Sequence, residues 1–157
     1  FQHEKVKPDI VLLAKGLANG VPIAVTLAKE EAAASFEKGD HGSTFGGNPI
    51  ACAAGIAVIN AIRDERMCEN ATSTGAYFLS RLKEFETSKK LVREARGKGL
   101  MLAIELKQPS KEYLLKLIEN GVLALPAGDM VLRFLPPLII TREQVDEVIL
   151  ALDKVLE

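Results

Sequence analysis

A lysine at the end of an apolar run is the first residue that could do chemistry. Lys15 directly follows Ile10–Ala14 and precedes the loop Gly16–Gly20. Such a run predicts a strand buried on both faces, as in a parallel sheet, and ligands of open α/β sheets bind where such strands end. Apolar neighbours disfavour the charged form of a lysine, and the neutral amine can form a Schiff base with a carbonyl. The alternative is a solvated strand-end lysine, which is the more common case.

A loop rich in glycine and small hydroxyls is the second candidate. It spans Asp40–Asn48 and contains Ser43 and Thr44, whose hydroxyls suit phosphate oxygens. Its glycines let the backbone approach a ligand, and the helix predicted to begin at Pro49 adds a partial positive charge. Neither a Walker pattern nor G-x-G-x-x-G occurs in the chain. The loop is therefore either an anion site or an ordinary helix-capping loop.

An arginine within an apolar run is the third candidate. Arg133 lies inside Val131–Leu135, which predicts a strand. A guanidinium in such surroundings needs an anionic partner, either a substrate carboxylate or an acidic side chain in a structural ion pair. The ion pair is the more common of the two. Arg96, which is followed by glycines, is expected to hold a turn.

The candidate residues are positioned by helices and strands, which alternate along the chain. Asn48 and Pro49 form a helix start, Thr141 and Gln144 form a capping box, and a helix break is expected near Asp64–Met67. The predicted helices are Glu30–Lys38, Pro49–Arg63, a continuation to Phe85, Lys111–Glu119 and Glu143–Leu156. The predicted strands are Ile10–Ala14, Pro22–Ala28 as its partner, Leu91–Arg96, Leu100–Leu106, Val122–Leu125 and Val131–Leu135.

A polar stretch in the sequence predicts a boundary between two lobes. The polar stretch Glu86–Lys90 is predicted to separate a first lobe, residues 1–88, from a small α+β lobe, residues 89–157. A buried central strand needs neighbours on both sides, and too few strand-like runs follow Ile10–Ala14 to supply them. Because the chain also begins with Phe1 rather than Met, we expect it to be the later part of a longer protein.

Composition excludes several classes of function. The 157 residues carry 20 basic and 21 acidic side chains, with no basic run beyond a Lys-Lys pair, so nucleic acid and anionic membranes are not expected partners. No apolar stretch has the length needed to span a bilayer. The two cysteines and two histidines form no cluster, so neither a disulfide framework nor a metal site is expected. A reducing, cytoplasmic location follows as an expectation.

The segments that carry these candidates resemble a known family when they are taken together. They are Asp9–Pro22, His41–Cys52, Arg96–Leu106 and Arg133–Thr141. In order and rough spacing they resemble the class III aminotransferases, pyridoxal-phosphate enzymes of fold type I. The resemblance is greatest to the acetylornithine aminotransferase group and its relatives that act on acylated lysine and ornithine. It implies an α/β fold: residues 1–88 would be the latter part of the large, cofactor-binding domain with long connecting helices, and residues 89–157 the small C-terminal α+β domain.

The resemblance also implies a role for each candidate. Lys15 matches the lysine that holds pyridoxal 5′-phosphate and then acts as the base that moves a proton. Thr44 matches a residue that binds the cofactor phosphate of the neighbouring subunit, so the implied assembly is a homodimer with a shared site. Ser43 matches a substrate contact, and Arg133 matches the arginine that holds the substrate α-carboxylate.

The implied reaction moves an amino group from an acylated ornithine- or lysine-type donor to 2-oxoglutarate, in arginine or lysine biosynthesis. A 4-aminobutyrate or ornithine aminotransferase is the alternative within the enzyme class, and a non-catalytic binding domain is the alternative outside it. In the family, an earlier part of the chain supplies the aspartate at the pyridine nitrogen, the stacked aromatic residue and the first phosphate loop. Since none of these can be assigned here, we expect the 157-residue chain alone to be inactive.

Overall fold

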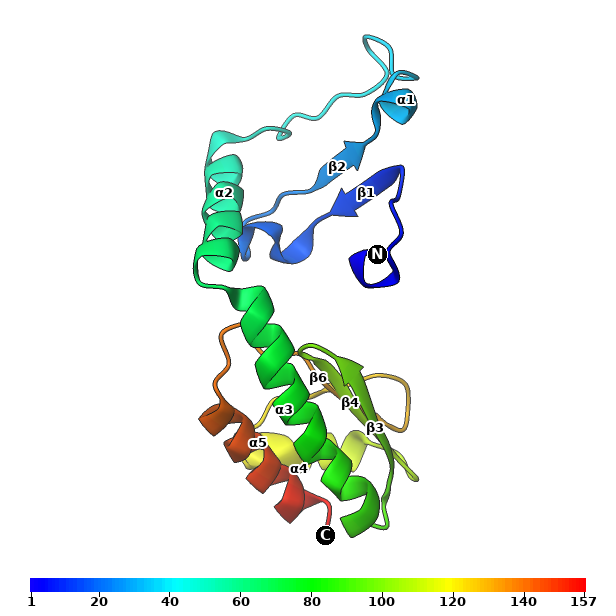
Figure 1. The fold of residues 1–157 in the computed structure, drawn as a ribbon, viewed down its shortest axis with the longest axis vertical. Helices are drawn as coiled ribbons and strands as arrows, with labels where there is room; N and C mark the ends of the chain where they lie inside the picture. Colours follow the sequence, from blue (N-terminus) through cyan, green and yellow to red (C-terminus); the bar gives the residue numbers. More distant parts are fainter. The chain divides into compact units, whose positions relative to one another are not determined.

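The contacts of the chain divide it into two units. The computed structural model describes residues 1–157, with one unit at Phe1–Glu65 and a second at Arg66–Glu157. Figure 1 labels their helices and strands. Each unit is described by itself below.

A two-stranded hairpin forms the centre of the first unit. Strand β1 (Ile10–Leu13) pairs antiparallel with β2 (Val25–Ala28), which confirms the predicted partnership. The expected burial in a parallel sheet is wrong for this chain, because Ile10 and Leu12 are 55% and 76% exposed. The physical reason is that β2 is the only strand beside β1, so no layer covers the hairpin.

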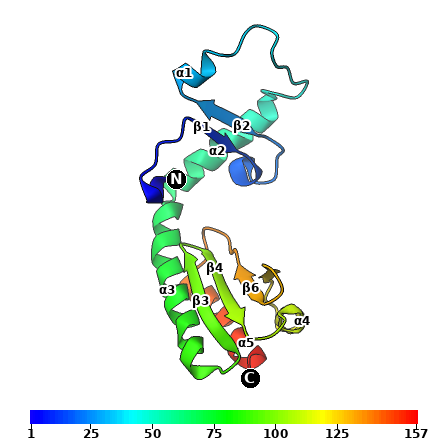
Figure 2. The same cartoon turned by 90° about the vertical axis from the view of Figure 1, so that its right-hand side faces the viewer.

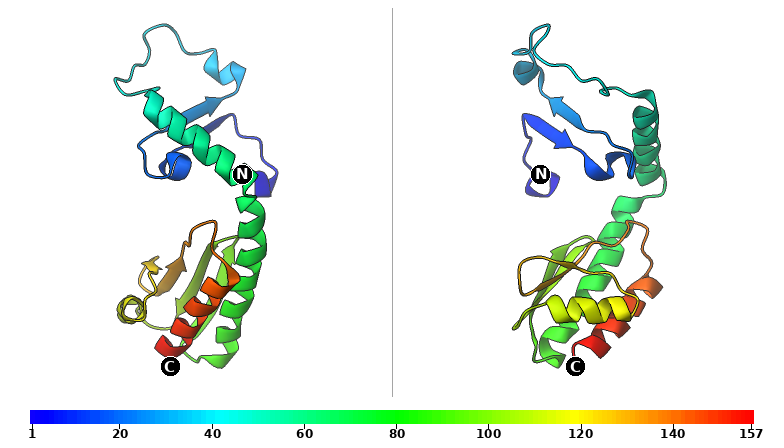
Figure 3. Two further views of the ribbon diagram at one scale, coloured as in Figure 1. Left: turned by 90° about the vertical axis from the view of Figure 1, so that its left-hand side faces the viewer. Right: turned by 180° about the vertical axis from the view of Figure 1, so that it is seen from behind.

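The helices of the first unit agree only in part with those that the local sequence predicts. Short 3-10 turns, η1 (Gln2–Glu4) and η2 (Lys15–Ala18), flank β1. Helix α1 covers only Glu30–Ala33, shorter than predicted, since it buries no side chain and lacks the packing that sustains a short helix. The segment between α1 and α2 is a long irregular loop (Figure 3).

Helix α2 (Pro49–Asp64) begins where the sequence predicts. The Asn48 side chain accepts hydrogen bonds from the amides of Ile50 and Ala51, at 3.0 and 3.2 Å. Ala51 and Gly55 are buried, and α2 packs against η2 through this small face. The predicted break after α2 is confirmed, because Arg66 adopts a left-handed backbone with φ of 52°.

The second unit contains a four-stranded antiparallel sheet with helices on one face. Its strands are β3 (Val92–Lys98), β4 (Met101–Leu106), β5 (Leu125–Pro126) and β6 (Val131–Phe134), in the order β3-β4-β6-β5. Its helices are α3 (Met67–Ser88), α4 (Lys111–Glu119) and α5 (Arg142–Val155). Helices α3 and α5 lie along the same face of the sheet (Figure 2). The predicted capping box of α5 is confirmed.

One prediction about this unit stays untested, and another needs correction. Helix α3 belongs to the second unit, so the contacts of this chain change at Glu65 rather than at Glu86–Lys90, and that polar boundary stays a prediction about the complete protein. The strand predicted at Val122–Leu125 is mostly absent. Its first amide, at Val122, instead donates to the Leu117 carbonyl at 2.9 Å and folds the chain back onto the end of α4.

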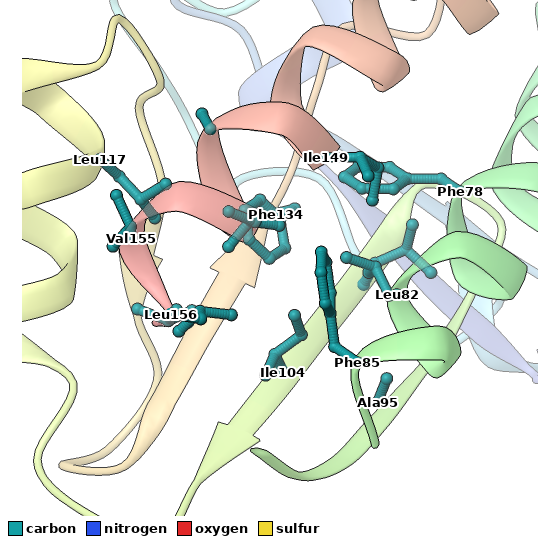
Figure 4. Close-up of a cluster of buried hydrophobic side chains, with 14 of the residues drawn as sticks. Phe78, Leu82, Phe85, Ala95, Ile104, Leu117, Phe134, Ile149, Val155 and Leu156 are labelled. Atoms are coloured by element: carbon teal, nitrogen blue, oxygen red, sulfur yellow. The ribbon is translucent and has the colours of Figure 1, made fainter. Parts of the chain in front are cut away.

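The core of the second unit lies between the sheet and its helices (Figure 4). Phe78 from α3 and Phe134 from β6 stack at a tilt, with ring centroids 5.5 Å apart. Leu82, Ile104 and Leu152 are fully buried around them. At Gly75, a Cβ atom would lie 2.2 Å from the Gly99 carbonyl oxygen, so α3 approaches the β3–β4 turn more closely than any side chain permits.

Candidate functional site

Lys15 has a backbone conformation that helix capping does not explain. It lies just after β1, separated from Leu13 by Ala14, and has φ of 52°, in the left-handed region that few non-glycine residues adopt. Lys5 and Asn19 share this conformation at the ends of η1 and η2, and Arg66 at the break after α2, whereas Lys15 begins its turn. Its side chain is exposed and makes no hydrogen bond or ion pair, so the predicted apolar surroundings are absent from this chain. Unexplained left-handed residues concentrate at functional sites.

The glycine-rich loop is shaped by its own short contacts. The Gly46 amide donates to the Ser43 Oγ at 2.9 Å, and a Cβ atom at Gly46 would lie 2.9 Å from the Ser43 Cβ. Gly47 has φ of 71°, which also favours glycine. Thr44 is exposed and its hydroxyl makes no hydrogen bond within the chain. The loop therefore presents the Thr44 hydroxyl as a free donor.

This loop borders a hollow in the first unit. Ser43, Phe45, Gly46, Gly47 and Asn48 line one part of it, and Pro22, Ile23, Ala24 and Ala51 line the rest. Lys15 does not line it. Because Asn48 already occupies two amides at the start of α2, an anion in the hollow would depend on the loop and its hydroxyls more than on those amides.

Arg133 lies in β6, opposite Ala103 of β4 and Leu125 of β5. Its Nε is buried and has no hydrogen-bond partner, and the guanidinium forms no ion pair. The alternative of a structural ion pair is therefore not found in this chain. An unsatisfied buried donor costs about 1–3 kcal/mol. A bound carboxylate would remove that penalty, so the site fits an anionic ligand.

Arg96 belongs to a charged cluster that the sequence did not reveal. It is in β3 and pairs with Glu94 at 3.0 Å and with Glu105 at 2.8 Å, so the prediction that it holds a turn is wrong. Arg93 pairs with the other Glu105 oxygen at 2.7 Å. The hydrogen bond to Glu105 raises the pKa of Arg96, and those from Arg96 and Arg93 hold the pKa of Glu105 below its usual value.

The candidate residues thus occur in both units. Lys15, Ser43 and Thr44 belong to the first, and Arg133 belongs to the second. No group of three or more His, Cys, Asp or Glu side chains is placed to hold a metal ion, and both cysteines are free. None of the helices combines the length and apolar character that a membrane crossing requires.

Comparison with known proteins connects these residues to one family. Residues 1–156 match the family model described as Aminotransferase class-III. Acetylornithine aminotransferase of Aquifex aeolicus is 47% identical, over 99% of this chain and 40% of the relative. LysW-aminoadipate semialdehyde transaminase of Deinococcus radiodurans is 42% identical, over 99% of this chain and 36% of the relative.

A solved structure gives the same result for the fold. That of Plasmodium falciparum ornithine delta-aminotransferase has a TM-score of 0.92 at 42% identity, over 99% of this chain and 41% of that chain. The predicted α/β fold, as part of a fold type I enzyme, is therefore confirmed. The chain spans about two fifths of the length of the curated relatives it matches, and it belongs to the class III aminotransferase family.

Proposed function

We propose that this chain is part of an aminotransferase that moves an amino group between an acylated ornithine- or lysine-type donor and 2-oxoglutarate. Lys15 carries the proposal: its left-handed backbone and unpaired side chain at the end of β1 have no role in the packing of the first unit. The similarity to acetylornithine and LysW-aminoadipate semialdehyde transaminases supports the donor class. The same similarity supports a role in arginine or lysine biosynthesis.

The residues of the chain fit pyridoxal 5′-phosphate, which the family implies. The free amine of Lys15 suits the aldehyde of that cofactor, and the free Thr44 hydroxyl suits its phosphate. When bound, the cofactor supplies an electron sink for the carbon that carries the transferred amino group, which in the proposed donor is the terminal side-chain carbon because the α-amino group is acylated. Lys15 would first hold the cofactor. Its released Nζ, as a neutral amine, would then take the proton from that carbon.

Arg133 would orient 2-oxoglutarate, whose α-carboxylate adjoins the carbonyl that receives the amino group. A guanidinium can bind such a group through two parallel hydrogen bonds. The carboxylate of an acylated ornithine or lysine lies several bonds from its transferred amine, so it would need another contact. The buried, unpartnered Nε of Arg133 supports this role. Ser43, whose Oγ accepts from Gly46, keeps its own hydroxyl proton for donation to a substrate.

A covalent trapping experiment tests the role of Lys15. Borohydride reduction of the complete enzyme should fix the cofactor to the peptide that contains Lys15, and mass mapping should locate it there. Lys15→Ala should abolish both this adduct and turnover, because no other residue of the first unit offers an amine at the end of β1. Lys38→Ala, at an exposed lysine of the same unit, is the control and should keep both. An adduct that maps to another lysine would disprove the assignment.

We also propose a cytoplasmic homodimer in which Thr44 binds the cofactor phosphate of the neighbouring subunit. Lys15→Ala and Thr44→Ala subunits would then complement each other, because one site of each mixed dimer has both intact residues. Random mixing makes half of the dimers mixed, so roughly a quarter of the sites should recover. The measurement is turnover after mixing the two inactive variants. Activity no higher than that of either parent would count against a shared site.

A second donor class also has support. One solved structure similar to this chain over 99% of its length is that of an ornithine delta-aminotransferase, so ornithine is the main competing donor. The family resemblance leaves 4-aminobutyrate as a further alternative. Comparing kcat/KM for N-acetylornithine, ornithine and 4-aminobutyrate with 2-oxoglutarate would separate these alternatives.

A further inference from the structure

Glu105 is a neighbour of Arg133 on the sheet of the second unit. The register places Arg96 opposite Ala103 and Ala103 opposite Arg133, so these residues form one row across three strands. Glu105 lies two residues beyond Ala103 on β4 and therefore shares its face, diagonal to Arg133. Diagonal side chains on a sheet are within reach of one another when they are long. Glu105 is thus placed to pair with Arg133.

A bulge in β3 gives Glu105 other partners. The register shifts between Val92 and Glu94, and both Val92 and Ala95 are buried although three positions separate them. The inserted residue changes the alternation, so Arg93 and Arg96 both lie on the side away from the core. Without it, strict alternation would place these two arginines on opposite faces.

The two arginines occupy both oxygens of Glu105. Arg93 Nη1 is 2.7 Å from Oε1, and Arg96 Nη1 is 2.8 Å from Oε2. The Glu105 side chain is only 21% exposed, whereas those of Arg93 and Arg96 are 57% and 44% exposed. The carboxylate is therefore held at a fixed place, and Arg133 is left without an anionic partner.

We propose that Arg93 and Arg96 are positioning residues that hold Glu105 away from Arg133 and so leave the Arg133 guanidinium available to a substrate carboxylate. The proposal rests on the proposed role of Arg133. A released Glu105 would act as a tethered carboxylate beside Arg133, and it would compete with the 2-oxoglutarate carboxylate that binds there. Binding of 2-oxoglutarate would weaken, while the chemical step would change less.

The test uses the complete enzyme with Arg93→Gln and Arg96→Gln combined. We expect the KM for 2-oxoglutarate to rise roughly two- to fivefold, the effect expected when a partly exposed ion pair competes with it, with a smaller change in kcat. Adding Glu105→Gln should restore this KM, because the competing carboxylate is then gone. A merely structural role predicts no such rescue. Lys116→Gln removes a charge from an exposed ion pair on α4 and is the control.

A crystal structure of the double variant gives a readout independent of turnover. We expect a Glu105 oxygen within hydrogen-bond distance of the Arg133 guanidinium. A carboxylate that stays away from Arg133, or a KM for 2-oxoglutarate that remains high after Glu105→Gln is added, would overturn the proposal.

A parallel measurement of Arg133→Lys separates the two possible failures. If Arg133→Lys leaves the KM for 2-oxoglutarate unchanged, the proposed role of Arg133 is wrong. If it raises that KM while the Arg93→Gln/Arg96→Gln variant does not, only the positioning role of Arg93 and Arg96 is wrong.

Discussion

Arg133 differs from every other arginine of the chain in what its guanidinium contacts. Five arginines pair with carboxylates, namely Arg63, Arg66, Arg81, Arg93 and Arg96. Arg142 lies over the Tyr77 ring, 5.0 Å from its centroid. Arg133 alone has neither kind of partner and also has a buried Nε. This contrast, rather than its position in an apolar strand, is the strongest residue-level argument for a ligand carboxylate.

Replacing Arg133 with lysine should weaken the binding of 2-oxoglutarate to the complete enzyme. Lysine keeps the charge but loses the paired hydrogen bonds, and losing such a pair in a dry site costs about 2–5 kcal/mol. We therefore expect a higher KM for 2-oxoglutarate, with a smaller change for the acylated donor, measured by steady-state kinetics. Arg142→Lys, at the ring contact of α5, is the matched control. An effect on the amino donor alone would instead assign Arg133 to the carboxylate at the far end of that donor.

The sequence identifies Arg133 as a candidate, but it does not show that Arg133 forms no ion pair in this chain. A cation inside Val131–Leu135 is visible in the sequence, because apolar neighbours make its charge unusual. Whether Glu105 pairs with it depends on Arg93 and Arg96, and so on a bulge in β3. One inserted residue reverses the faces of all the residues after it, and no local signal in the strand fixes its position.

Among the elements, those with strong local signals were predicted well. Helix α2 has its Asn48 cap and Pro49, and α5 has the Thr141–Gln144 box, so neighbouring residues alone determine where they begin. Strand β5 and helix α1 were wrong in extent, because their length depends on packing that the sequence does not show. The close approach at Gly75 was also missed, since a glycine inside a helix has several possible reasons.

Replacing Gly75 with alanine should destabilise the second unit. A Cβ atom there would lie 2.2 Å from the Gly99 carbonyl, and backbone on both sides prevents an easy adjustment. Overpacking of this kind costs about 1–3 kcal/mol, more than the roughly 1 kcal/mol that alanine gains in helix propensity. Urea denaturation followed by circular dichroism measures the difference. Ser80→Ala on the exposed side of α3 is the control, and equal stability of Gly75→Ala and wild type would contradict the close contact.

At the scale of the whole chain, the two units differ in how they bury apolar residues. The continuous core, including Phe78, Leu82 and Ile104, belongs to the second unit. In the first unit the buried apolar residues are Ala18 and Ala51, while Leu12 is 76% exposed and Ile50 is 75% exposed. Apolar side chains are therefore plentiful in the first unit, but the chain supplies no layer to cover them.

Hydrogen exchange of the 157-residue chain alone should report this difference. Amides of β4 should be protected most, because they exchange only when the core opens, whereas amides of β1 and β2 should exchange much faster. The bare hairpin has free strand edges and exposed apolar side chains, so the chain should also self-associate as its concentration rises.

Leu12→Lys should reduce this association and leave β4 protection unchanged, because it adds a charge to β1 only. We expect no transamination from the isolated chain, since Lys15 and the glycine-rich loop both belong to the unit without a core. A monomer with β1 protected as strongly as β4 would contradict the predicted difference in stability. Steady turnover by the purified chain, with any longer enzyme excluded by mass, would contradict the predicted lack of activity.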